Sequence, residues 1–205
     1  MDIAIIGTGN VGGALATKWA HAGHTILLGV RNASNFKGTH LLDNPNTSIH
    51  NIHDAVANAQ VILLATPAPA AIEVAKSLGN TQGKVIIDSM NIVMGRGPAG
   101  FHNTTDAILA NTASDAVIKC FNTTGFNNMA NTAYSGMHID NFVAGDDANA
   151  KTIAQQLSND AGFENCYDVG GNDKFQLMEQ FAFFWINLAI FQKEGREIAF
   201  KLLKR

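Results

Sequence analysis

The sequence has few of the residue types that mark secreted, disordered or nucleic-acid-binding proteins. Only two cysteines, Cys120 and Cys166, occur in 205 residues, so neither a disulfide framework nor a cysteine-based metal site is expected. Charged residues make up 15% of the chain, and the net charge of -3 comes without a basic stripe, which argues against a nucleic-acid partner. The 46% hydrophobic content argues against disorder. A compact globular protein remains.

No leader or membrane-spanning segment is recognisable in the sequence. Met1 and Asp2 lead directly into an apolar stretch, without the charged start and small-residue cleavage site of a signal peptide. The apolar run from Phe181 to Phe191 is shorter than the about 20 residues that a bilayer requires. We therefore expect a cytoplasmic protein without a membrane partner.

Glycine, by contrast, is frequent, and three of the 19 glycines form one motif. Gly7, Gly9 and Gly12 make a G-x-G-x-x-G between the apolar run Asp2–Ile6 and a helix-like segment, Val11–Ala22. In a dinucleotide-binding turn the first glycine permits a tight turn, the second lets the backbone approach a pyrophosphate, and the third lets helix and strand pack closely. The free N–H groups of the helix N-terminus then hold the phosphates.

The residue after the second expected strand, Thr25–Val30, indicates which dinucleotide binds. An NAD-preferring chain carries Asp or Glu here for the ribose 2′-hydroxyl, whereas this chain carries Arg31. A guanidinium can hold a 2′-phosphate through paired hydrogen bonds. Asn32, Ser34 and Lys37 follow closely enough to assist. We expect NADP(H); the alternative is that Arg31 is a solvated loop residue.

Strand-like and helix-like segments alternate along the chain, which is typical of βαβ units. We expect an α/β fold with a Rossmann-type, doubly wound and mainly parallel sheet: an NADP-binding domain over residues 1–135 and a smaller C-terminal α/β part over residues 136–205 that ends in a long helix. The further expected strands are Gln60–Thr66, Lys84–Ser89, Ala116–Phe121 and Asn141–Gly145, and the further expected helices are His53–Asn58, Ala70–Leu78, Thr105–Asn111 and Ala148–Leu157.

Two acidic residues follow the strand expected at Asn141–Gly145. Asp146 and Asp147 could be paired carboxylates for a metal or for acid–base chemistry. Asp147 also directly precedes the helix expected at Ala148–Leu157, where it is well placed as an N-cap. We favour the cap and expect no metal. The basic residues Lys201, Lys204 and Arg205 are interpreted as a solvated helix end.

An ordered set of segments resembles the coenzyme F420-dependent NADP oxidoreductase family, which includes the reductase domain of the STEAP ferric reductases. The segments are Gly7–Gly13, Leu28–Asn32, Ala65–Pro67, Lys119–Thr123, Ala144–Asp147 and Ala161–Phe163. The resemblance implies NADP(H) as cofactor, hydride transfer at the nicotinamide, and F420 or a flavin as the second substrate. An F420-type deazaflavin with an anionic tail should meet basic residues, for which Arg96 and Lys174 are the candidates.

Position by position, the resemblance assigns Thr8, Asn10 and Val11 to the pyrophosphate, Arg31 to the 2′-phosphate and Ala65–Ala68 to the nicotinamide ribose. It places Asn122 near the nicotinamide. Together with the loops that follow the buried strands, the expected cofactor-binding residues are Gly7, Thr8, Gly9, Asn10, Val11, Gly12, Arg31, Asn32, Ser34, Lys37, Ala65, Thr66, Pro67, Ala68, Asn91 and Asn122.

No catalytic residue is assigned, because hydride transfer between a nicotinamide and a flavin-like ring needs orientation rather than proton transfer. A small imine or carbonyl substrate is the alternative, and it would require a general acid; His102 is the nearest loop candidate, although an exposed loop histidine is the simpler interpretation. Cys120 is either a redox-sensitive thiol or a buried small apolar residue. A non-catalytic NADPH-binding redox sensor also remains open.

The C-terminal segment carries aromatic residues around much of an expected helix: Phe181, Phe183, Phe184, Trp185 and Phe191. One face of such a helix can bury in the core and another in a second copy of the chain. We therefore expect a homodimer. The same rings could also wall a substrate pocket.

Overall fold

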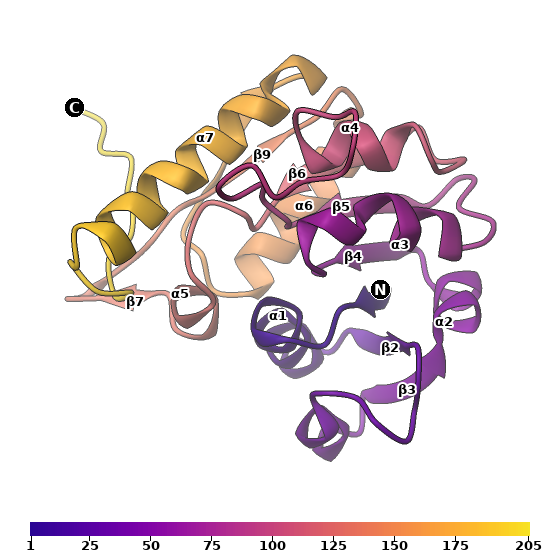
Figure 1. Ribbon diagram of the computed structural model, residues 1–205. Helices are drawn as coiled ribbons and strands as arrows, with labels where there is room; N and C mark the ends of the chain where they lie inside the picture. Colours follow the sequence, from indigo (N-terminus) through magenta and orange to yellow (C-terminus); the bar gives the residue numbers. More distant parts are fainter.

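The computed structural model describes residues 1–205, and one eight-stranded sheet runs through it with helices on both faces (Figure 1). The strands of this sheet are β1 (Asp2–Ile6), β2 (Thr25–Val30), β3 (Thr47–Asn51), β4 (Val61–Leu64), β5 (Val85–Asp88), β6 (Val117–Cys120), β9 (Asn141–Ala144) and β10 (Cys166–Gly170). A separate hairpin consists of β7 (Ala133–Tyr134) and β8 (Met137–His138).

The strand order is β10-β9-β6-β5-β4-β1-β2-β3. The six strands from β6 to β3 are parallel, and β9 is antiparallel to β6. Ile3 of β1 pairs with Ile26 of β2 on one side and Val61 of β4 on the other. The chain therefore changes direction across the sheet at β1, as in the Rossmann fold, and leaves a crevice at the carboxyl ends of β1 and β4. The expected fold class is confirmed.

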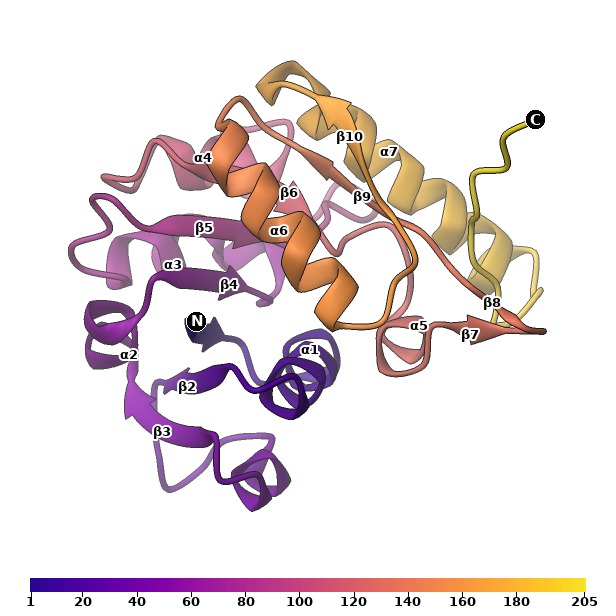
Figure 2. The ribbon, with the colours of Figure 1, turned by 180° about the vertical axis from the view of Figure 1, so that it is seen from behind.

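The helices form two layers, which Figures 1 and 2 show from opposite sides. The helices are α1 (Asn10–His21), α2 (Ile52–Asn58), α3 (Ala71–Ser77), α4 (Thr104–Leu109), α5 (Phe126–Ala130), α6 (Ala148–Asp160) and α7 (Phe175–Ile186), and the shorter turns are η1 (Thr39–Asp43), η2 (Ala68–Ala70), η3 (Asn172–Lys174) and η4 (Asn187–Phe191). α1 and α6 cover one face around Ile5, Trp19 and Leu157, and α2, α3 and α4 cover the other around Ile62 and Ile86. α7 packs on the second face.

Each strand and helix expected before residue 160 forms, and no end shifts by more than three residues. Four strands were not expected: β3, β7, β8 and β10. They lie at the sheet edge or in the small hairpin, and most of their residues are partly exposed. Without full burial they lack the continuous apolar pattern that identifies β4 or β5. The division at residue 135 stays a prediction, although β9 and β10 extend the same sheet.

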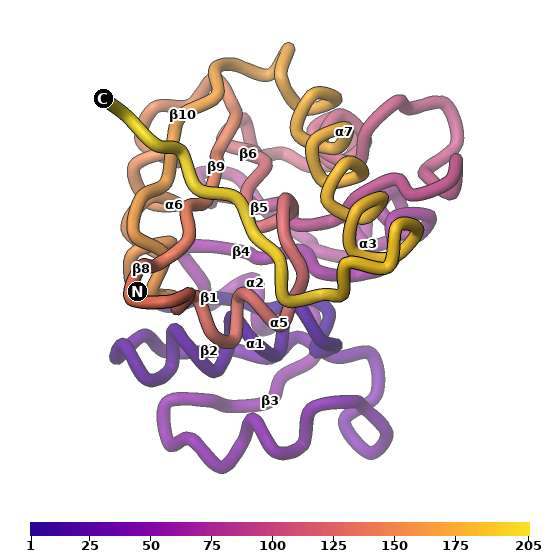
Figure 3. The backbone as a smooth tube through the Cα atoms, turned by 90° about the vertical axis from the view of Figure 1, so that its left-hand side faces the viewer, coloured from indigo at the N-terminus to yellow at the C-terminus, as the bar shows by residue number.

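The expected long C-terminal helix forms as α7 and η4, and the chain continues beyond it. After η4 the residues from 192 onward are irregular, and Figure 3 shows them as an extended segment in yellow. We call residues 196–205 the C-terminal tail. Trp185 Nε1 donates to Ile198 O at 2.6 Å, and Lys201 Nζ contacts Glu164 at 2.9 Å. The interpretation of Lys201 as part of a helix end is therefore wrong, because tertiary partners and not a helix dipole hold it. No helix has the length and apolarity needed to cross a membrane.

Candidate cofactor and substrate site

The glycine motif forms the turn between β1 and α1, beside the strand-end loop of β4. Gly7 has a φ of 107°, and a Cβ there would lie 2.4 Å from Ala65 O. A Cβ on Gly12 would lie 1.9 Å from Gly7 O, whereas a Cβ on Gly9 would meet no atom within 4 Å. Two glycines are therefore required by the packing of the turn itself. Gly9 instead faces open space, which is where a pyrophosphate would lie.

The N-terminus of α1 is left free of protein partners. No side chain caps it, and no acidic residue stands in its first turn. A cavity of about 350 Å3 opens beside this end, so backbone N–H groups and the positive end of the helix dipole are available to an anion. Thr8 Oγ1 donates to Lys37 O and ties the glycine turn to the loop after β2. The cavity is lined by Thr8, Gly9, Asn10, Gly13, Ala14, Thr17, Lys18, Lys37, Gly38, His40, Phe126 and Ala130.

The loop after β2 presents its polar residues outward. Arg31 is exposed and has no hydrogen bond or ion pair within the chain, so its guanidinium is free for a ligand. Asn32 Oδ1 accepts from Ser34 N at 2.9 Å, which shapes the loop. Lys37 lines the phosphate-side cavity together with Lys18 and His40. Lys18 and His40 were not predicted from the sequence motifs, because their place beside this cavity depends on how the loop folds over α1.

Three further strand-end loops meet on the other side of the crevice. Thr66 Oγ1 donates to Met90 Sδ at 3.2 Å. Asn91 Nδ2 donates to Asn122 O at 2.8 Å, and Asn122 Nδ2 returns a bond to Asn91 Oδ1 at 2.9 Å. Thus the structure brings together the loops after β4, β5 and β6, as the parallel strand ends require. Pro67 and Ala68 begin the short turn η2 beside them.

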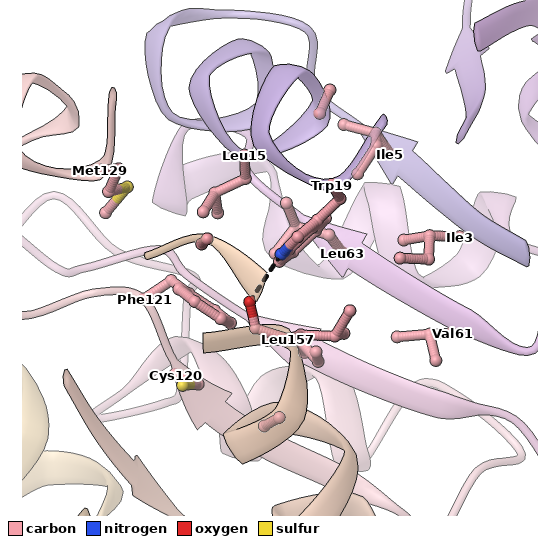
Figure 4. Close-up of a cluster of buried hydrophobic side chains, with 14 of the residues drawn as sticks. Ile3, Ile5, Leu15, Trp19, Val61, Leu63, Cys120, Phe121, Met129 and Leu157 are labelled. Carbon is pink, nitrogen blue, oxygen red and sulfur yellow. Dashed lines mark hydrogen bonds between the residues drawn. The ribbon is translucent and has the colours of Figure 1, made fainter. Parts of the chain in front are cut away.

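The backbone just before Asn122 has an unusual conformation. Phe121 has a φ of 58°, in the left-handed region that bulky residues rarely adopt. Its buried ring packs edge-on against Trp19 with 5.4 Å between centroids, and Trp19 Nε1 donates to Leu157 O at 2.8 Å (Figure 4). Core packing therefore holds this conformation, which costs of the order of 1–3 kcal/mol. This strained position directly precedes Asn122.

Asn122 has one polar atom without a partner. Its Nδ2 donates to Asn91 and to Met178 O at 3.1 Å, but its buried Oδ1 accepts no hydrogen bond. Buried acceptors are nearly always paired in native proteins. An added N–H donor is the kind of group that would satisfy it. The uncapped turn at Gly9, the free guanidinium of Arg31 and the unpaired Asn122 Oδ1 are therefore the groups of the crevice that could hold a dinucleotide.

A buried ionic cluster lies beneath these loops, and the sequence analysis missed it. Lys119 Nζ lies 2.8 Å from Asp88 Oδ2 and 2.8 Å from Glu179 Oε1. Thr104 Oγ1 and Thr105 Oγ1 complete the surroundings of Asp88 at 2.5 and 2.7 Å. The Lys119 and Asp88 side chains are 0% exposed, and that of Glu179 is 6% exposed. We call Asp88, Lys119 and Glu179 the buried triad.

The buried triad fixes the loop that carries Asn91. Asp88 Oδ1 accepts from Met90 N at 2.9 Å, and Glu179 Oε2 accepts from Ile92 N at 2.8 Å. The backbone on both sides of Asn91 is thus bound to carboxylates. The signal in the sequence was one charged residue in each of two otherwise apolar strands, Asp88 at the end of β5 and Lys119 within β6, since charged residues are almost never fully buried unless paired.

The remaining candidates are placed as follows. Burial raises the pKa of the Cys120 thiol well above its ordinary value, so this residue is protonated and packs as a small apolar side chain. Asp147 Oδ1 accepts from Ala150 N at 2.7 Å, which confirms the N-cap. Lys174 pairs with Asp173, and Arg96 closes a tight turn with Val93. His102 is exposed and lines a second cavity beside α7.

The chain is similar to known proteins in sequence and in fold. Residues 2–92 match the model of the family described as NADP oxidoreductase, coenzyme F420-dependent. No curated protein sequence matches the chain. A crystal structure from Arthrobacter sp. FB24, named as a candidate F420-dependent NADP reductase, has a TM-score of 0.86 at 24% identity, with 100% of both chains covered.

Two other solved structures share the fold at lower identity. A hypothetical protein from Sinorhizobium meliloti has a TM-score of 0.73 at 21% identity, covering 100% of this chain and 96% of that one. A reductive aminase from Aspergillus terreus, in complex with NADPH and ethyl levulinate, has a TM-score of 0.67 at 18% identity, covering 94% of this chain and 62% of that one. The family match confirms the resemblance over residues 2–92, and the structures confirm the fold over the remainder.

Proposed function

We propose that the chain transfers hydride between NADP(H) and an acceptor seated beside Asn91 and Asn122, on the premise that residues 2–92 match the coenzyme F420-dependent NADP oxidoreductase family. One observation carries the proposal. The glycine turn at the crevice leaves the N-terminus of α1 uncapped and Gly9 facing open space. Arg31, rather than an acidic residue, follows β2.

In this proposal the protein binds and orients, and the cofactor supplies the hydride. The turn at Gly7–Gly12 holds the pyrophosphate through backbone N–H groups, and Arg31 holds the 2′-phosphate with help from Asn32, Ser34 and Lys37. Ala65–Ala68 border the nicotinamide ribose. Asn91 and Asn122 orient the nicotinamide end, and α7 holds them through Met178 O and Glu179. Orientation of this kind lowers barriers by up to about 7–11 kcal/mol in favourable cases.

Two acceptor classes follow from different observations. The family match supports a flavin-like or deazaflavin acceptor of the F420 type. The second cavity supports a small imine or carbonyl instead, because its volume is about 340 Å3 and neither lysine nor arginine lines it to meet an anionic tail. The reductive aminase that shares the fold was solved with NADPH and small organic molecules, which supports the same alternative.

The deciding experiment follows NADPH absorbance in the presence of purified protein, with F420, FMN, FAD, ferric chelate, a quinone, a cyclic imine and a cyclic ketone in separate reactions. We expect oxidation of NADPH with one class, and slower turnover in Asn122→Ala. The matched control is Asn149→Ala, since Asn149 is exposed on α6 beside the amino ends of β4 and β5, away from the crevice. Tight NADPH binding without any turnover would contradict the enzyme and leave a redox sensor; absence of NADPH binding would refute both.

We also propose that the protein is a homodimer. Phe184, Ile190 and Phe191 are 44–52% exposed along α7 and η4. Trp185 is not part of this face, because it is buried and bonded to the C-terminal tail. Phe184→Glu should therefore halve the mass measured by light scattering, whereas Lys76→Glu on α3 should leave it unchanged. A dimer that persists in Phe184→Glu would refute the assignment of this face.

A further inference from the structure

A second cavity lies between α7 and the loop after β5, next to the nicotinamide end of the crevice. Its volume is about 340 Å3, within the range of small-molecule sites. Ile92 forms one wall and directly follows Asn91 in the chain. Glu179 forms another wall and follows Met178, whose carbonyl oxygen accepts from Asn122. The cavity is lined by Ile92, Met94, Gly95, His102, Gln176, Glu179, Gln180 and Phe183.

Glu179 is the one residue with a carboxylate or an ammonium in this lining. Its Oε1 is occupied by Lys119 Nζ and by Thr104 N at 2.9 Å. Its Oε2 accepts a single hydrogen bond, from Ile92 N. Because each carboxylate oxygen has two acceptor positions, Oε2 keeps one that no protein group uses.

The charge of the buried triad is unbalanced. Asp88 and Glu179 carry two negative charges, and Lys119 carries one positive charge between them. One negative charge therefore remains close to the cavity wall, in surroundings where charges are screened much less than in water. Arg96 follows Gly95 in the sequence but does not line the cavity. The electrostatic preference of the cavity is thus for a cation.

We propose that this cavity binds an organic cation, a protonated amine or an iminium ion, whose N–H donates to Glu179 Oε2. Ile92, Met94 and Phe183 supply apolar surface for the organic part, and an aromatic ring is itself attractive to a cation. The inference deepens the proposed function, since it names the acceptor class that would sit beside the nicotinamide.

An iminium substrate also removes the need for a general acid. The substrate carbon gains a hydride from NADPH and forms a C–H bond, while the π electrons of the C=N+ bond move to nitrogen. The products are a neutral amine and NADP+, so charge and electrons balance without a proton donor. The exposed His102 then needs no catalytic role. A neutral imine or carbonyl substrate would instead require a general acid.

The first test compares three ligands of one shape by calorimetry: cyclohexylamine as the cation, cyclohexanol as the neutral molecule and cyclohexanecarboxylate as the anion. Each is titrated into the whole protein at neutral pH, with and without NADP+. We expect the amine to bind about tenfold or more tightly than the other two, as for a hydrogen bond to a charged group. In Glu179→Gln this preference should disappear. Equal or tighter binding of the alcohol or the carboxylate by the unmodified protein would overturn the proposal.

A second variant keeps the test decisive if Glu179→Gln does not fold. Gln176 is exposed on the cavity rim, so Gln176→Lys should fold and should weaken amine binding relative to the matched Gln176→Leu. Identical amine binding by these two variants would count against the proposal. NADPH binding is measured in the same samples: amine selectivity without NADPH binding refutes the proposed function alone, whereas NADPH turnover without amine selectivity refutes only this inference.

Discussion

Replacing Lys119 by Met removes the ammonium that the two carboxylates of the buried triad share. Lys119 Nζ lies 2.8 Å from Asp88 and Glu179 and 2.9 Å from Thr104 Oγ1. Met fills a similar volume, so the main loss is electrostatic: two buried carboxylates face each other without compensation. Breaking a buried ion pair in this way costs about 3–5 kcal/mol, a large part of the about 5–15 kcal/mol by which proteins are stable.

The assay is urea unfolding followed by tryptophan fluorescence, supported by thermal melting. A loss of about 3–5 kcal/mol corresponds to a fall in Tm of about 6–20 °C for a chain of this size. The matched control is Lys151→Met, because Lys151 contacts Asp168 at the same 2.8 Å, but Asp168 is 46% exposed. An exposed pair contributes about 0–1 kcal/mol.

A triple variant separates charge from packing. Lys119→Met combined with Asp88→Asn and Glu179→Gln removes all three charges, so it should recover much of the stability lost by Lys119→Met alone. The reasoning is refuted if Lys119→Met costs no more than Lys151→Met, or if the triple variant is less stable than the single one.

Three further predictions concern the cofactor site and the tail. Arg31→Ala should weaken NADPH binding by about 1.5–3 kcal/mol, the value of a hydrogen bond to a charged group, and leave NADH binding unchanged; equal losses by calorimetry would contradict the role of Arg31. Gly9→Ala should lower NADPH affinity but change the free energy of unfolding by less than about 1 kcal/mol. Gly12→Ala, whose Cβ would lie 1.9 Å from Gly7 O, should destabilise the fold by about 1–3 kcal/mol. Equal stabilities of the two variants would argue against the turn geometry. The hydrogen bond and charge of Lys201 lower the pKa of Glu164 from its ordinary value of 4.5. The stability from this pair is therefore present above pH 4.5 and is lost as the pH falls through the lowered pKa. Hydrogen-exchange protection of the C-terminal tail should fall in that pH range, and Lys201→Met should abolish this pH dependence.

The part of the site that could be predicted is the part that local sequence determines. The glycine turn needs only a strand, three glycines and a helix start within Asp2–His21, so its geometry follows from chain chirality and sterics. Asp147 as an N-cap is equally local. The strand-end loops were found because parallel strands place their carboxyl ends at one edge, whatever the details of packing.

The parts that were missed depend on segments far apart in the chain. The edge strands β3 and β10 are defined by pairing rather than by burial, so their sequences lack the apolar pattern of a central strand. The tail cannot be placed from sequence because Lys201 finds partners at Asp140 and Glu164, on another layer of the fold.

The sequence by itself determined the fold class, the dinucleotide turn and the set of loops around the crevice, because these rest on the local periodicity and backbone preferences of short segments. Only the tertiary structure decided what lies beneath Asn91 and Asn122. Asp88, Lys119 and Glu179 come from β5, β6 and α7, and they form one ionic cluster only where the packed sheet and helix exclude water and bring them within hydrogen-bond distance.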